Sequence, residues 1–259
     1  MSKLQNSLFS PRVHVPRSGS RALEKYLSSW KEINQFVNFV LISVSHIDRN
    51  AEIAHQTLLT SPNEKTRIDT EKTWNSRVSA KESLRANRQF FVEIILVRHI
   101  ENYLNYLSSL LYEIFVQRPE TLKSSEKIEV SVALQCDSIE TLVREIAEKK
   151  VESLSYSSFS DLYIFFEDRF GLKLASEEQL KLLLEAIEIR NISVHNRCHI
   201  NKRYISRLRL DSENIGKLKE LGIEDLEKLI PKLIEMAISV DKQARSKLHL
   251  NGIRSPKQV

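Results

Sequence analysis

The chain has 259 residues, of which 41% are hydrophobic, and this length supports one sizeable core or one core with a smaller appendage. It contains only five glycines and six prolines, and this scarcity of turn residues argues against β-sandwiches, barrels and glycine-rich nucleotide folds and favours long helices. The net charge of +5 permits a polyanionic partner without requiring one.

The first part of the chain is expected to be a basic arm followed by a helical extension. Residues 1–20 contain prolines and serines but no acidic residue, which is typical of a flexible basic arm. Over 21–60, apolar residues recur every three to four positions and predict a long helix, which the Ser-Pro step at 61–62 ends. A polar stretch follows to about residue 78, and we place an N-terminal helical extension at 21–82.

The rest of the chain is expected to form an all-α helical domain over 83–250, with a basic tail at 251–259. Within it, 121–137 is ambiguous, because the alternation at 128–132 also fits a short strand. Helices are predicted from about 78 to 117, from 138 to about 151, over 160–170, over 176–194, and over 224–248 with Pro231 as an expected kink. The fourth of these begins with a capping box formed by Ser176 and Gln179.

Neither a membrane nor an oxidising compartment is expected. The longest uncharged stretch, 33–47, is polar and shorter than the roughly 20 apolar residues of a membrane-spanning helix. The N-terminus lacks the apolar segment of a signal peptide. Two cysteines, Cys136 and Cys198, are too few for a disulfide framework or a zinc knuckle. We therefore expect a cytoplasmic protein with reduced thiols.

Positive charge is concentrated at 189–210, which holds six Lys or Arg and two His but no acidic residue. The helix that begins at Ser176 carries an apolar stripe on the face where Arg190 and Asn191 then follow. A guanidinium on a packed face is costly unless it is paired. It either extends to solvent or pairs with a carboxylate such as Glu185 or Glu188, or it forms an anion site where the bundle meets a partner.

His195 follows Arg190 by five residues, about 500° of helical rotation, which places it about 140° from the Arg face. The two groups converge on one ligand only if the helix ends near His195 or if a second copy contributes. A histidine at a helix end is also commonly a surface or capping residue. Its basic neighbours favour a functional role here.

The residues at 190–195, Arg-Asn-Ile-Ser-Val-His, resemble the signature of the HEPN superfamily, in which an Arg and a polar residue precede a His. The segment at 196–205 is similar to the one that follows this signature in many HEPN proteins. The resemblance covers about residues 85–250. It departs from the family at Cys198, where many relatives have Gly, and at Arg197, where relatives silenced by nucleotidylation have Tyr.

The resemblance implies a HEPN-like helical bundle of four to five helices and a metal-independent endoribonuclease. Such enzymes act in toxin–antitoxin systems, abortive infection and antiviral defence, so an antitoxin or regulatory protein is an expected partner. They form homodimers in which two motifs share one composite active site. Carried over, Arg190 and His195 are the catalytic pair and Asn191 is the polar helper, with no cofactor and no metal.

The residue types suit RNA cleavage by attack of the 2′-OH on the adjacent phosphate. Histidine, with a reference pKa of about 6.5, can serve as base and as acid, and arginine offers a fixed fork for phosphate oxygens. The expected products are a 2′,3′-cyclic phosphate and a 5′-OH. The side chains expected to bind the RNA backbone are Arg197, His199, Lys202 and Arg203, together with Arg207 and Arg209.

Two other hypotheses remain. A non-catalytic HEPN-like module would bind RNA or a partner protein, and its Arg190 and His195 would stabilise a dimer. A helical adaptor without a nucleic-acid role is the third, and the acid-free run counts against it. On the second long helix, His99, Glu101 and Asn102 are expected to be core or interface groups, although the same cleft is an alternative.

Overall fold

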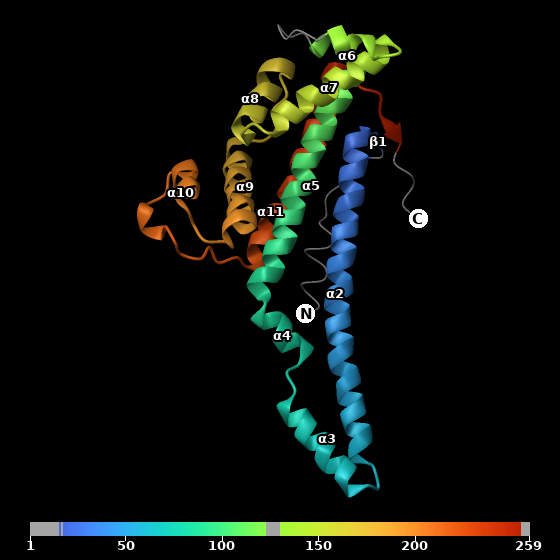
Figure 1. The fold of residues 1–259 in the computed structure, drawn as a ribbon, viewed down its shortest axis with the longest axis vertical. Helices are drawn as coiled ribbons and strands as arrows, with labels where there is room; N and C mark the ends of the chain where they lie inside the picture. The colour runs from blue at the N-terminus through green and yellow to red at the C-terminus, as the bar shows by residue number, and fades with distance from the viewer. Residues whose placement is uncertain (1–15, 17, 123–129, 255–259) are drawn as a thin grey trace.

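The computed structural model describes residues 16, 18–122 and 130–254, and these residues are almost entirely helical (Figure 1), which confirms the all-α prediction. None of the described helices combines the length and the apolar character needed to cross a membrane. The helices are α2 (Arg21–Leu59), α3 (Glu64–Ser76), α4 (Ala80–Ala86), α5 (Arg88–Gln117), α6 (Val130–Leu134), α7 (Ile139–Ser155), α8 (Phe159–Phe170), α9 (Glu177–Asn196), α10 (Lys202–Leu208) and α11 (Ile223–Leu248), with short 3₁₀ helices η1 (Pro119–Leu122) and η2 (Ser212–Asn214).

Polar side chains fix where most of these helices begin. Each accepts a hydrogen bond from a backbone N–H of the first turn, which otherwise has no partner inside the helix. The capping residues are Ser20, Asn63, Ser79, Ser138, Ser158, Ser176 and Asn201. The predicted capping box at Ser176 is confirmed, and Gly171 ends α8 in the left-handed conformation that glycine adopts without strain.

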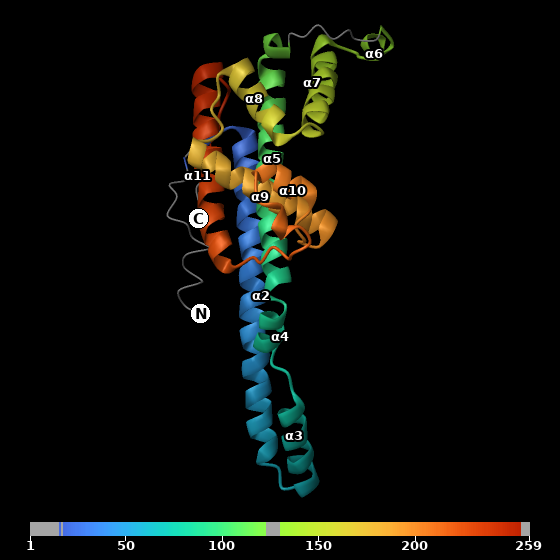
Figure 2. The same cartoon turned by 90° about the vertical axis from the view of Figure 1, so that its left-hand side faces the viewer.

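Helix α5 is the centre of the bundle, and α2, α7, α9 and α11 all contact it. Figures 1 and 2 show α2 and α5 running side by side in opposite directions. Between them, Tyr26 packs against Tyr103 and Tyr106, with ring centroids 6.2 and 5.4 Å apart. The Tyr106 hydroxyl donates to the carbonyl of Ala237 at 2.9 Å and so ties α11 to the same core.

The core therefore includes the first half of α2, which the sequence analysis assigns to a separate extension. Ala22, Leu23 and Tyr26 are almost completely buried, and Val37 is buried further along the helix. Only the second half of α2, together with α3 and α4, projects from the bundle (Figure 1). The sequence boundary at residue 82 consequently divides elements that pack against one another.

The projecting part contains a helix that the sequence analysis describes as a polar stretch. Helix α3 has no buried residue, so the apolar period that predicts helices is missing from it. Instead, Asn63 caps its first turn. The long helix expected from about residue 78 is also interrupted, because α4 ends at Ala86 and Asn87 separates it from α5.

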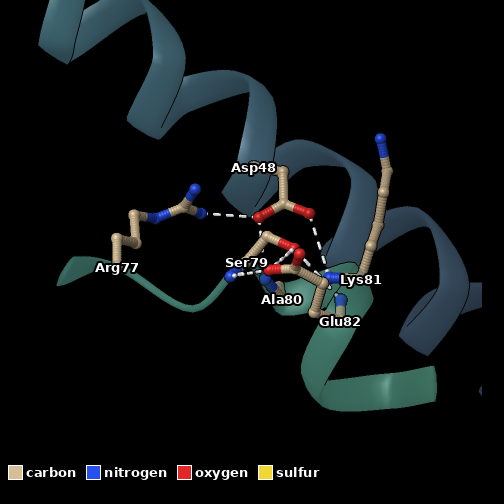
Figure 3. A network of polar contacts seen from close by, with 6 residues as sticks. All are labelled: Asp48, Arg77, Ser79, Ala80, Lys81 and Glu82. Carbon is tan, nitrogen blue, oxygen red and sulfur yellow. Dashed lines mark hydrogen bonds and ion pairs between the residues drawn. The ribbon is translucent and has the colours of Figure 1, made fainter. Parts of the chain in front are cut away.

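A polar network fastens α4 to α2 (Figure 3). The Asp48 carboxylate of α2 accepts hydrogen bonds from the backbone N–H groups of Ala80 and Lys81, at 2.8 and 3.0 Å. It also forms an ion pair with Arg77 at 2.5 Å. Ser79 and Glu82 form a capping box beside it. Asp48 thus binds backbone donors that the first turn of α4 leaves without an intrahelical partner.

The two ends of the described chain meet in a short ribbon. Strand β1 (Ser18–Gly19) pairs antiparallel with β2 (Ile253–Arg254). The buried Ser20 donates its backbone N–H to the Asp241 carboxylate of α11, at 3.2 and 3.3 Å. The last residues of the expected flexible arm are therefore fixed to the bundle, while 1–15, 17 and 255–259 lie outside the described residues.

The ambiguous segment at 121–137 forms no strand where it is described, and its described residues are helical at 121–122 and 130–134. Helix α6 occupies Val130–Leu134, so the strand that the sequence left open for 128–132 is excluded at the described positions, and 123–129 lie outside the described residues. A lone alternating segment has no strand with which to form a ladder, and local helical hydrogen bonds then satisfy its backbone.

Candidate functional site

Helix α9 carries the Arg190, Asn191 and His195 motif. Leu183, Ile187, Ile189 and Ile192 are buried against the bundle and fix the rotation of the helix. This rotation leaves the Arg190 side chain 28% exposed. The motif therefore lies along the border between the packed and the solvent-facing sides of α9.

Arg190 is held by two groups. Its Nη2 forms an ion pair with Glu101 Oε1 of α5 at 3.1 Å, and its Nη1 donates to the Asn191 amide oxygen at 3.1 Å. Its Nε is buried without a hydrogen-bond partner. A guanidinium has more N–H donors than these two contacts use, so Arg190 keeps capacity for a further acceptor.

The carboxylate that pairs with Arg190 is not one of those expected from the sequence. Glu185 instead binds Lys219, with Nζ and Oε1 3.0 Å apart. Glu188 is buried and accepts a long 3.5 Å hydrogen bond from the Asn191 amide. The expected local pairing is wrong because the packing of α9 against α5 brings a carboxylate 89 residues away closer to the guanidinium.

A cavity of about 580 Å³ lies beside Arg190, between α5, α9, α10 and the turn from α7 to α8. Six aliphatic side chains and one aromatic side chain provide its apolar wall, and three arginines and a group of serines provide much of its polar part. The apolar residues are Leu104, Leu154, Phe159, Leu162, Leu184, Ile187 and Leu208. The principal polar residues are Glu101, Asn105, Ser108, Ser155, Ser157, Ser158, Ser160, Glu188, Arg190, Asn191, Arg203 and Arg207.

His195 is exposed in the last turn of α9 and does not line this cavity. Because α9 is helical through Asn196, the rotation between Arg190 and His195 stays near 140°. Within one chain, Arg190 and Asn191 thus share the cavity, and His195 lies at its own solvent-facing position.

The four residues expected to bind RNA are all exposed but occupy different places. Arg203 lines the cavity. Arg197 ends α9 with a positive φ of 49°, and the His199 ring Nδ1 lies 2.9 Å from the Arg197 carbonyl oxygen. Lys202 is the first residue of α10. The structure therefore brings Arg203 to Arg190 and places the other three along the turn that follows α9.

Sequence reasoning missed the role of Glu101. It lines the cavity and binds Arg190, which agrees with the cleft alternative rather than with the preferred core assignment. His99 is buried in the core as expected, at 2% exposed, but its Nε2 has no hydrogen-bond partner, and burial lowers its pKa to about 4. The Asn102 amide donates to the Tyr26 carbonyl at 3.0 Å and serves helix packing.

The cavity's serines also had no signal in the sequence: Ser108 lies within α5, and the others lie at or beside the turn between two predicted helices. Ser158 caps α8, and its hydroxyl and N–H both bind Asp161. Among the residues that the structure describes, no group of three His, Cys, Asp or Glu is arranged to hold a metal ion, and Cys136 and Cys198 are both free thiols.

Comparison of the chain with protein-family models, with curated proteins and with solved structures gives no match.

Proposed function

We propose that this protein is a metal-independent endoribonuclease of the HEPN type, which cleaves RNA by 2′-OH attack to give a 2′,3′-cyclic phosphate and a 5′-OH. The Arg-x4-His signature on α9 motivates this proposal. The observation that carries it is that Arg190 lines an open cavity and has Nη donors beyond the two contacts that hold it, five residues before an exposed His195. A role in antiviral defence, abortive infection or as a toxin is part of the same proposal.

In this mechanism the guanidinium of Arg190 binds the non-bridging oxygens of the scissile phosphate and stabilises the charge of the phosphorane. Asn191 orients that guanidinium through its 3.1 Å hydrogen bond. One imidazole removes the proton from the 2′-OH, and another donates a proton to the leaving 5′-oxygen. The atoms balance within the RNA, since the 2′-oxygen replaces the 5′-oxygen on phosphorus.

The proposal requires two copies of the chain. Arg190 and His195 lie about 140° apart on one helix, so one protomer does not direct both at the same phosphate. A two-fold axis near the exposed end of α9 would bring His195 of one protomer toward the cavity of the other and supply the two imidazoles. Arg197, His199 and Lys202 would then hold the RNA backbone on either side.

The test is cleavage of a labelled single-stranded RNA in the presence of EDTA. We expect cleavage by the wild type and at least about a hundredfold loss in His195→Ala and in Arg190→Ala, because general acid–base catalysis by the imidazole and electrostatic stabilisation by the guanidinium each contribute about that much. His46→Ala removes an exposed histidine of α2 and serves as the matched control. The 5′-OH ends of the products accept phosphate from a polynucleotide kinase without prior dephosphorylation. Cleavage that persists in both motif variants would overturn the mechanism.

A second candidate is a non-catalytic module that binds RNA or a partner protein. The observation that favours it is the Arg190–Glu101 ion pair, since a purely structural arginine would make the same contact. Under this hypothesis no RNA is cut, and the motif variants lose thermal stability or dimerisation. Analytical ultracentrifugation of wild type, Arg190→Ala and His195→Ala separates the two candidates when combined with the cleavage assay.

A further inference from the structure

The cavity beside Arg190 has the features of a ligand site that the motif itself does not require. Its volume of about 580 Å³ falls within the 300–1,000 Å³ typical of small-molecule sites. Such sites usually combine an apolar wall with a few convergent polar groups, whereas polar residues predominate in this lining, as suits a charged ligand. Here the aliphatic wall is formed by α5, α7, α8, α9 and α10, and the arginines enter from α9 and α10.

The two arginines of α10 are the available cations. Arg203 and Arg207 are one helical turn apart, so both side chains project to the same side of α10 and reach the same cavity. No ion pair joins either of them to another described residue. Arg190, in contrast, is already paired with Glu101.

The acidic residues near the cavity do not neutralise Arg203 and Arg207 equally. Glu101 is occupied by Arg190, and Glu188 is buried and bound to the Asn191 amide. Asp161 lies within electrostatic range of Arg207, and its carboxylate accepts hydrogen bonds from Ser158. Arg203 is therefore the main unpaired charge, and Arg207 supports it.

We infer that this cavity binds one nucleotide unit, with the phosphate at Arg203 and Arg207 and an unpaired base against the aliphatic wall. An arginine fork matches the oxygens of a phosphate, and a base buries its faces against apolar side chains. The Asn105 amide and the serine hydroxyls offer donors and acceptors for the base edge and the ribose. A paired base cannot enter, because its edge and faces are covered within the duplex.

This inference rests on the proposed function in one respect. It takes the bound nucleotide to be the residue of the RNA substrate next to the scissile phosphate. A free nucleotide carries the same chemistry, so the experiment includes both. The site is distinct from the backbone contacts proposed for Arg197, His199 and Lys202, because none of these lines the cavity.

The test is fluorescence anisotropy with a labelled RNA of about 12 nucleotides, a length within the range of known single-strand sites. The RNA carries 2′-fluoro groups, so binding is measured without cleavage. The same strand in a duplex and free AMP are the other two probes. The variant is Arg203→Gln/Arg207→Gln, and its control is Lys181→Gln/Lys217→Gln, which removes the same charge from exposed positions outside the cavity.

We expect the cavity variant to weaken binding of the single strand about tenfold or more, as the loss of a charge-assisted contact does. The control should weaken it about twofold through the general electrostatic term. AMP should compete for the single strand in the wild type, and the duplex should bind more weakly. If the cavity variant weakens binding of AMP but not of RNA, the cavity is a nucleotide site whose ligand is a free nucleotide.

Equal effects of the two double variants, or a duplex that binds as tightly as the single strand, would overturn the inference. The outcome is separable from that of the proposed function. A wild type that cleaves no RNA but binds in an Arg203-dependent manner contradicts only the ribonuclease. His195-dependent cleavage with variant-independent binding contradicts only the nucleotide site.

Discussion

Glu101 of α5 and Arg190 of α9 form an ion pair in which Oε1 and Nη2 are 3.1 Å apart, and this pair connects two helices that line the cavity. Both side chains are 28% exposed, so solvent screens the attraction. The pair therefore contributes more to the orientation of the guanidinium than to the stability of the fold.

Replacing Glu101 with Gln should separate these two roles. We expect the free energy of unfolding to fall by about 0.5 kcal/mol, as for other partly exposed pairs. RNA cleavage should fall further, because the unpaired guanidinium samples more rotamers. Urea denaturation and initial cleavage rates measure the two effects. Arg98→Gln is the control, since it removes the weaker 3.4 Å contact of Glu101 and leaves Arg190 paired; an equal loss of cleavage in both variants would contradict the positioning role.

The buried imidazole of His99 should make the protein sensitive to acid. Burial lowers its pKa to about 4, below the reference of about 6.5 that applies in the unfolded chain. Between these values the unfolded chain binds the proton and the folded chain does not, so stability falls as the pH is lowered from 6.5 to 4, by about 3 kcal/mol in total.

His99→Leu should remove this part of the acid destabilisation, because leucine has no proton to bind and the His99 Nε2 has no hydrogen-bond partner to lose. The measurement is the unfolding free energy at a series of pH values, compared with His46→Leu at an exposed position. If the pH slope of His99→Leu equals that of the wild type, the imidazole is not the source.

Asp48 should control the attachment of the projecting helices. Desolvation raises its pKa, but the hydrogen bonds from Ala80 and Lys81 and the Arg77 ion pair outweigh this, so the net pKa lies below its ordinary value. Its stabilising effect is therefore present above the ordinary carboxyl pKa and is lost as the pH falls through the lowered value.

We expect Asp48→Ala to increase amide hydrogen exchange in α3 and α4 by about tenfold while exchange in α5 stays unchanged, since local opening is independent of the core. Mass spectrometry of peptides from 60–87 gives the readout. Asp69→Ala, at an exposed position of α3, provides the comparison. Unchanged amide protection of α3 and α4 in Asp48→Ala would show that packing alone holds these helices against α2.

Asp241 should be required to hold the segment around Ser20 against α11. Its side chain is 2% exposed and accepts the backbone N–H of Ser20. Asp241→Ala leaves that buried donor unpaired, which costs about 1–3 kcal/mol. Asp241→Asn keeps an oxygen acceptor and should lose less. Chemical denaturation of the two variants tests this order, and an alanine variant as stable as the wild type would refute it.

The local sequence was sufficient to predict the helices that have an apolar period. Apolar periods predicted α2, α5, α7, α8, α9 and α11, and the capping box at Ser176 marked the start of α9 correctly. These signals are local, because a helix closes its hydrogen bonds within four residues. Helix α3 escaped the same analysis because it buries no residue and so has no apolar period.

The surroundings of Arg190, in contrast, depend on how distant helices pack. The sequence identified the residue and the cost of burying it, but it suggested carboxylates on the same helix. The partner is Glu101, and the cavity adds Arg203, Arg207 and serines from the turn between α7 and α8. Such contacts depend on the relative rotation and depth of packed helices, which the buried faces of α5, α9 and α10 determine together. No single segment encodes that arrangement, because it is the joint minimum of all their contacts.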